Sequence, residues 1–239
     1  LPDLAKQVAR WGDEPAFADR TTLEGATRAG LAKHLQGLAA GDVPETEPDA
    51  VGAVGRLALL DGFVGAELPY FTPKHPGRHW VAVPTGGNRV TPCRVFVPEK
   101  LSDKQPVPLV VALHGAGGSE NLFFDGYGAG HVVKECEKRG WLLAAPRSPL
   151  ALLGGSPPVP EVVAKLAERY PVDAERVFLV GHSMGGGQAV ELVQQKPGAY
   201  AGLAVLGGAG RVRKPEAFAD LRVFVGVGSA DFALAGSRA

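Results

Sequence analysis

A serine between two glycines is the residue best suited to chemistry in this sequence. Gly181, Ser183 and Gly185 form the pattern Gly-x-Ser-x-Gly, in which the hydroxyl attacks a carbonyl carbon as a nucleophile. The apolar run 177–180 predicts a buried strand before it, and the run 188–195 predicts a helix after it. The alternative is a glycine-rich turn with an incidental serine. The strand–turn–helix context favours the catalytic interpretation.

A second glycine-rich stretch, His-Gly-Ala-Gly-Gly-Ser-Glu at 114–120, follows a run expected to be an apolar strand. Backbone N–H groups at a strand end stabilise negative charge on a carbonyl oxygen when no side chain obstructs them. We expect Ala116 and Met184, the residue after the serine, to supply these donors. The stretch lacks the glycine spacing of dinucleotide-binding and phosphate-binding loops. We expect His114 to brace the loop rather than to act as a base.

A carboxylate, Asp231, follows the last expected strand. In a serine–histidine–acid triad the acid fixes the tautomer of the histidine and stabilises its charged form. A surface aspartate in a turn is the alternative, and we favour the acid role. The six histidines all precede Ser183, at positions 34, 75, 79, 114, 131 and 182. His182 is next to the serine, where neighbours point in different directions, so the 239 residues lack a convincing general base.

Composition excludes several classes of protein. Lys+Arg and Asp+Glu both number 25, so nucleic acid and anionic membranes are not expected as main partners. No apolar run reaches the roughly 18–20 residues of a membrane span. Cys93 and Cys136 are far apart, in no metal-like spacing. Two buried thiols are the default expectation, and a disulfide stays open.

The pattern changes near residue 77. Before it, amphipathic segments with proline-rich joints predict a small helical region over 1–70. After it, strands alternate with helices, which predicts a mostly parallel sheet with helices on both faces and ligands beyond the carboxyl ends of its strands. We expect strands at 79–83, 91–97, 106–113, 141–145, 176–180, 200–206 and 221–227, and helices at 131–138, 161–170 and 188–195.

From residue 77 to the end the chain resembles the α/β-hydrolases, and within them the polyhydroxybutyrate depolymerases, feruloyl esterases and related esterases. The segments LVVALHGAGGSENLFFDGYG, RVFLVGHSMGGG and VFVGVGSADFALAG carry the resemblance. It implies that Ser183 is the nucleophile, Ala116 and Met184 the oxyanion donors and Asp231 the triad acid. It also implies hydrolysis of small or polymeric carboxylic esters through an acyl-enzyme, without metal or cofactor. Residues 1–70 are not covered.

The resemblance also marks a departure, because the histidine of this fold comes after the acid. We therefore expect a chain that ends before its last strand and histidine loop, with little activity of its own. Phe123, Phe124 and Tyr127 either line an acyl pocket or pack locally. A peptidase on the same fold and a non-catalytic binding domain are the competing functions. We expect a secreted or periplasmic protein, and the oligomeric state stays open.

Overall fold

A seven-stranded sheet forms the centre of the molecule. The computed structural model describes residues 20–41, 50–63, 69–87, 89–101, 105–148, 156–208, 210–231 and 234. Within them the strand order is β1-β2-β4-β3-β5-β6-β7. The strands are β1 (Gly77–Pro84), β2 (Val90–Val97), β3 (Val107–Leu113), β4 (Leu142–Pro146), β5 (Val172–His182), β6 (Gly202–Leu206) and β7 (Arg222–Gly226). β2 is antiparallel to both of its neighbours, and all other pairs are parallel.

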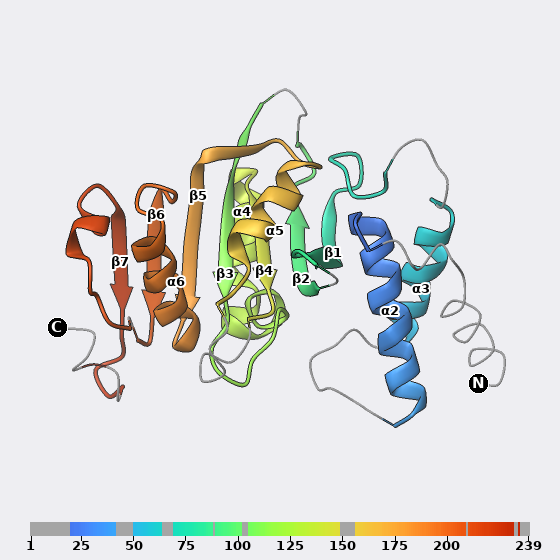
Figure 1. Cartoon of the computed structure of the whole chain (residues 1–239), viewed down its shortest axis with the longest axis horizontal. Helices are drawn as coiled ribbons and strands as arrows, with labels where there is room; N and C mark the ends of the chain where they lie inside the picture. Colours follow the sequence, from blue (N-terminus) through green and yellow to red (C-terminus); the bar gives the residue numbers. More distant parts are fainter. Residues whose placement is uncertain are drawn as a thin grey trace.

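Helices cover both faces of this sheet, as the sequence predicts. The helices are α2 (Leu23–Ala39), α3 (Ala50–Asp61), α4 (His131–Arg139), α5 (Val159–Ala167) and α6 (Met184–Gln195), with short turns η2 (Leu122–Gly126), η3 (Tyr127–Ala129) and η5 (Pro215–Phe218). Figure 1 shows α5 and α6 in front of the sheet, and α2 with α3 beside the β1 edge. A mostly parallel sheet between helices is therefore confirmed.

Side-chain alternation along β3 divides the interior into two cores. Leu109, Val111 and Leu113 point into the larger core, which α2, α3, α5 and α6 share. Val110 and Ala112 point to the opposite face, where η2 and α4 pack. Successive side chains of a strand lie on opposite faces, so one apolar run supplies both cores. The carboxyl ends of β3 and β5 are thereby held in a sheet that is buried on both sides.

Strand and helix boundaries differ from expectation by a few residues. β5 begins at Val172, four residues early, because Val172 pairs with Val107 and Val107 donates to the Pro171 carbonyl at 2.8 Å. α5 begins at Val159, two residues early, with Pro160 in its first turn. Proline is tolerated there because those N–H groups have no partner within the helix. The amphipathic segment over 4–11 and the capping residues at 46–49 lie outside the described residues.

α2 covers the outer edge of β1. Thr27 is buried in α2, and its hydroxyl accepts a 3.0 Å hydrogen bond from the Ala82 N–H. Glu24 accepts from the Phe71 N–H at 3.0 Å and pairs with Arg169 at 3.1 Å. Side chains of α2 and α3 belong to the same core as the sheet. An otherwise unpaired strand edge is in this way closed by a helix.

The opposite edge is different. β7 pairs with β6, and no other described strand lies beside it. Val223, Phe224 and Val225 are 46%, 60% and 43% exposed. An apolar strand with one open edge is prone to pair with another chain.

Cys93 and Cys136 are both buried and unpaired, and burial raises the pKa of Cys136 to about 12. No described helix combines the length and apolar character needed to cross a membrane.

The Thr27 contact can be tested directly. Thr27→Val keeps the shape but leaves the Ala82 N–H without its acceptor, so we expect the free energy of unfolding to fall by about 1–3 kcal/mol. Thr27→Ser retains the hydroxyl and is the control. Urea unfolding followed by circular dichroism measures both. Equal stability of the Val variant and the wild type would contradict the assignment.

Candidate active site

Ser183 sits on a strained turn between β5 and α6. Its backbone dihedrals are φ 52° and ψ −117°, and among the described residues Ala129 is the one other non-glycine residue with positive φ. Such a conformation costs on the order of 1–3 kcal/mol and is kept when its surroundings enforce it. The Ser183 N–H donates to the Leu206 carbonyl at 2.8 Å, and the Gly187 N–H donates to the Ser183 carbonyl at 3.2 Å. The turn is thus fixed by β6 and by its own helix.

The flanking glycines allow α6 to approach the sheet. A Cβ atom on Gly181 would lie 2.3 Å from the Gly185 carbonyl oxygen. A Cβ atom on Gly185 would lie 2.1 Å from the Leu113 carbonyl oxygen. Both distances are far below van der Waals contact, and the obstacles are main-chain atoms that cannot turn away. The spacing Gly-x-Ser-x-Gly is therefore imposed by main-chain packing at this corner.

The loop after β3 packs against the serine turn. A Cβ atom on Gly115 would lie 3.4 Å from the Ser183 Cβ and 2.9 Å from the His182 Nδ1. Ala116, the next residue, is exposed, and Gly117 has a positive φ of 73°. The two glycine-rich stretches, 68 positions apart at Gly115 and Ser183, are therefore neighbours in space. Met184 begins α6 directly after the serine.

His114 braces this loop with both ring nitrogens. Its Nδ1 lies 2.8 Å from the Gly115 carbonyl oxygen, and its Nε2 accepts a 2.9 Å hydrogen bond from the Ser148 N–H. Since Nε2 accepts, the proton sits on Nδ1 and the ring is neutral. Burial lowers the pKa of His114, which favours the same neutral form. With both nitrogens occupied, His114 is a structural residue.

A buried carboxylate holds the far end of the loop. Glu120 is fully buried and accepts from the Trp80 Nε1 at 2.9 Å and from the Arg147 Nε at 2.9 Å. A buried charge of this kind persists when it is paired and hydrogen-bonded. Sequence reasoning missed this network, because its members are 27 and 40 positions from Glu120. The pattern of residues within one helix or strand does not indicate contacts between residues so far apart in the sequence.

Asp231 lies at the same end of the sheet. Its Oδ2 and the His182 Nε2 are each 3.4 Å from the position of a Cβ atom on Gly207, so they are separated by no more than twice that distance. The His182 ring also packs on Tyr127, with centroids 4.8 Å apart. The described residues offer no hydrogen-bond partner to the buried His182 Nδ1. His182 therefore fills the space between the serine turn, the glycine loop and Asp231, a role that sequence reasoning did not foresee.

The three aromatic residues after the loop occupy different environments. Phe123 and Phe124 are both 1% exposed and pack in the core with Val133 and Cys136 of α4. Tyr127 is half-buried, and its hydroxyl accepts a 3.4 Å hydrogen bond from the Gly115 N–H. Burial of the two phenylalanines favours the local-packing interpretation for them. Tyr127 is the one of the three that contacts the loop and the His182 ring.

Comparison with known proteins agrees with this geometry. A family profile described as serine aminopeptidase, S33, matches residues 159–229. A thermostable esterase is 25% identical with a TM-score of 0.51, over 62% of this chain and 45% of that protein. A mutant feruloyl esterase module from Clostridium thermocellum, solved with sinapinate, is 17% identical with a TM-score of 0.56, over 72% of this chain and 75% of that one. This protein has the α/β-hydrolase fold.

The likeness is partial in extent. The chain spans less than half the length of the thermostable esterase. A poly(3-hydroxybutyrate) depolymerase from Bordetella parapertussis also matches, with 19% identity and a TM-score of 0.45 over 60% of this chain and 57% of that protein. The 25% identical thermostable esterase supports the sequence resemblance to α/β-hydrolases of the esterase type. The catalytic roles of the individual residues around Ser183 stay predictions.

The close approach of α6 can be tested with two glycines of the same turn. Gly185→Ala places a methyl group against the Leu113 carbonyl, so we expect a loss of at least about 1–3 kcal/mol in the free energy of unfolding. Gly187→Ala is the control, because its nearest heavy atom would be Gly210 Cα at 3.6 Å. Within a helix that change should be neutral or stabilising by about 0.5–1 kcal/mol. Equal effects in urea unfolding would contradict the packing argument.

The bracing role of His114 predicts a dependence on pH. An unfolded histidine has a pKa of about 6.5, and burial lowers the pKa of His114 in the fold. Below the pKa of the unfolded histidine, the unfolded chain therefore binds a proton that the folded chain does not bind. The free energy of unfolding falls as a result. We expect His114→Gln to reduce this loss, measured as urea unfolding at about pH 7.5 and about pH 5.5. His79, whose pKa burial also lowers, contributes equally to both proteins. An unchanged pH dependence in the variant would exclude the role.

Proposed function

We propose that this protein is a serine hydrolase that cleaves carboxylic esters through an acyl-enzyme. The proposal rests on the strained backbone of Ser183, φ 52°, at the carboxyl end of β5. The loop after β3 packs against this residue. Strain of this kind at a strand–helix corner is maintained where a nucleophile must stand clear of the sheet. The 25% identical thermostable esterase supports the choice of ester substrates.

The proposed chemistry has two steps. The Ser183 Oγ attacks the ester carbonyl carbon, the C–O bond to the alcohol breaks, and the alcohol leaves with a proton. Water then attacks the acyl-serine, which releases the carboxylic acid and restores the hydroxyl. The N–H groups of Ala116 and Met184 are assigned to the oxyanion that forms in each step. Asp231 is assigned to orient the base, and no metal or cofactor is required.

We do not assign the general base of this mechanism to any of the six histidines. No histidine follows Asp231 in the sequence, where the order of this fold requires it. His114 is engaged by main-chain groups on both nitrogens, and His79 contacts the His75 carbonyl through Nε2. Within the described residues the His182 ring makes no hydrogen bond to Ser183, and its Nδ1 has no partner. We therefore propose that the 239 residues alone hydrolyse esters slowly. A serine hydroxyl without a base retains the catalysis due to the oxyanion hole and binding.

The substrate is proposed to enter beside Tyr127. This side chain contacts Gly115 and the His182 ring, and it combines an apolar ring with a hydroxyl. Phe123 and Phe124 support it from the core rather than from the surface, since Phe123 packs edge-to-face on Tyr127 at 4.9 Å between centroids. An acyl group with an apolar or aromatic body fits such a wall.

A peptidase on the same fold is the second candidate. The profile that matches 159–229 is described as a serine aminopeptidase, and the amide and ester reactions share one nucleophile and one oxyanion hole. Parallel assays with a p-nitrophenyl ester and an aminoacyl p-nitroanilide separate the two. Turnover of the anilide at or above the rate of the ester would replace the esterase proposal with the peptidase.

Covalent labelling tests whether Ser183 is a nucleophile. We expect a fluorophosphonate probe to label the 239-residue chain slowly and at Ser183, identified by mass spectrometry, and to leave Ser183→Ala unlabelled. Turnover of p-nitrophenyl acetate should lie far below the roughly 1–10³ s⁻¹ of ordinary enzymes. Rapid turnover lost in Ser183→Ala would mean that a base exists among these 239 residues. No labelling at all would favour the non-catalytic binding domain.

A further inference from the structure

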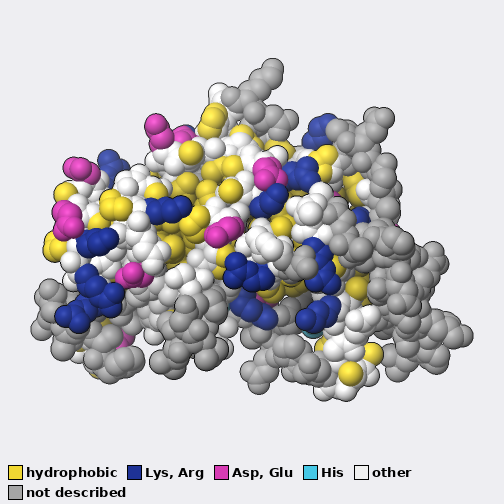
Figure 2. Space-filling model, in the orientation of Figure 1, with side chains coloured by type: hydrophobic (Ala, Val, Ile, Leu, Met, Phe, Trp, Pro, Cys, Tyr) yellow, Lys and Arg dark blue, Asp and Glu magenta, His cyan; other side chains and the backbone are white. Residues whose placement is uncertain are grey.

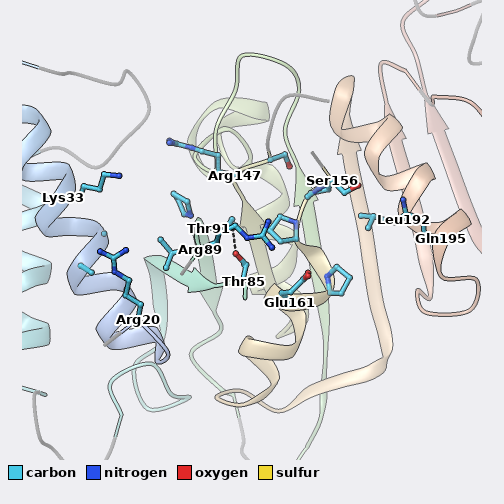
Figure 3. A pocket seen from close by; sticks show the side chains of 18 residues that line it. Arg20, Lys33, Thr85, Arg89, Thr91, Arg147, Ser156, Glu161, Leu192 and Gln195 are labelled. Atoms are coloured by element: carbon cyan, nitrogen blue, oxygen red, sulfur yellow. Dashed lines mark hydrogen bonds between the residues drawn. The ribbon is translucent and has the colours of Figure 1, made fainter. Parts of the chain in front are cut away.

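A cavity separate from the serine turn lies on the face of the sheet that α2, α5 and α6 cover. Its volume is about 710 Å³, within the range of roughly 300–1,000 Å³ that small-molecule sites occupy. Its walls come from α2, from the turn between β1 and β2, from the end of β4 and from the start of α5 (Figure 3). Neither Ser183, Ala116, Met184 nor Asp231 is among its described lining residues. It is therefore a site distinct from the proposed hydrolytic one.

The lining of this cavity is strongly cationic. Arg20, Lys33, Arg89 and Arg147 line it, and Glu161 is the one carboxylate among the described lining residues. The chain as a whole has equal numbers of basic and acidic residues, so the excess is local. Figure 2 shows several Lys and Arg side chains close together on this face, near α2 and the sheet. A concave wall with one sign of charge concentrates its field and attracts counter-ions.

Arg147 is held in place by its buried partner. Its Nε donates to Glu120 at 2.9 Å, and its side chain is 32% exposed. Figure 3 shows Lys33 extending from α2 on one side of the cavity and Arg147 from the end of β4 on the other. Glu120 offsets the charge of Arg147, so the net attraction comes from Arg20, Lys33 and Arg89 against Glu161. The lining of the cavity therefore has a net positive charge even when Arg147 is left out of the count.

Hydroxyl groups and rigid apolar walls complete the cavity. The Thr85 and Thr91 hydroxyls are 3.3 Å apart, and the buried Ser148 hydroxyl has no hydrogen-bond partner among the described residues. Pro157 and Pro158 line the side that leads into α5. Proline rings present an apolar surface that loses little entropy when a ligand binds. The cavity thus offers charge and hydroxyls to one end of a ligand and apolar surface to the other.

We propose that this cavity binds a small organic anion, with a carboxylate or phosphate group near Lys33 and Arg89 and an apolar body against the prolines. Oxyanions of both kinds accept hydrogen bonds from arginine and from hydroxyl groups. The ligand does not need to be an ester, because the cavity contains no nucleophile of the proposed hydrolytic site. The proposal therefore does not depend on the esterase function.

Calorimetric titration of the 239-residue protein tests this site. The probes are phenyl phosphate, benzoate and, as the uncharged control, benzyl alcohol. We expect at least one anion to bind saturably and benzyl alcohol to bind much more weakly. Tighter binding of phenyl phosphate assigns the site to phosphorylated ligands, and tighter binding of benzoate assigns it to carboxylates. Because screening weakens exposed charges, added salt should reduce the affinity.

Charge-removing variants locate the binding. Lys33→Gln combined with Arg89→Gln should weaken anion binding about tenfold or more, because two of the cations that line the cavity lose their charge. Lys134→Gln is the matched control, because Lys134 is an exposed cation on α4, on the opposite face of the sheet. Both changes are at exposed positions, and thermal unfolding without ligand verifies the folds. Arg147 is not substituted, because its loss would leave the buried Glu120 carboxylate without this ion-pair partner.

Three results would overturn the proposal. They are no saturable binding of either anion at millimolar concentrations, equal binding of benzyl alcohol, and equal affinities of the double variant and Lys134→Gln. Ser183→Ala should bind the anion as the wild type does. If its affinity fell with that substitution, the anion would be binding at the serine turn and the separate site would be refuted.

Discussion

The architecture depends on how closely α6 approaches the ends of β3 and β5. At Gly185 the main chain of the helix meets the Leu113 carbonyl with no room for a methyl group, and at Gly181 the strand meets the Gly185 carbonyl in the same way. Main-chain atoms cannot change rotamer to relieve such contacts, so positions 181 and 185 accept only glycine without a shift of the backbone. Ser183 lies between these two glycines with a strained backbone, φ 52°.

That corner also determines what surrounds the serine. β3 and β5 are adjacent and parallel, with Leu113 paired to Gly181, so the loop after β3 emerges directly beside the serine turn. The same register brings β6 alongside, and Leu206 receives the Ser183 N–H. Gly207, the next residue, leaves the space into which His182 and Asp231 both reach. The candidate site is thus a consequence of strand order and of small residues at three strand ends.

Local sequence predicted the elements of this site better than their contacts. The apolar runs and glycine spacings predicted the parallel sheet, the serine turn and the proximity of the glycine loop, because strand ends in a parallel sheet converge. The Thr27–Ala82 hydrogen bond and the Glu120 network were not predictable, because they join residues 27 to 55 positions apart through single polar atoms. The packing of His182 was missed for a related reason. Its neighbours are set by the turn at Gly207 and the ring of Tyr127, neither of which leaves a pattern near residue 182.

The segment that follows β4 connects the two candidate sites. Arg147 lines the cationic cavity while its Nε holds Glu120, and the N–H of Ser148 fixes the His114 ring under the glycine loop. Two successive residues therefore support the glycine-rich loop at 114–120 on one side and line the cavity on the other. Because Glu120 is fully buried, moving Arg147 away would leave a carboxylate without its cation, at a cost of several kcal/mol. The Arg147–Glu120 ion pair therefore links the wall of the cavity to the end of the glycine-rich loop.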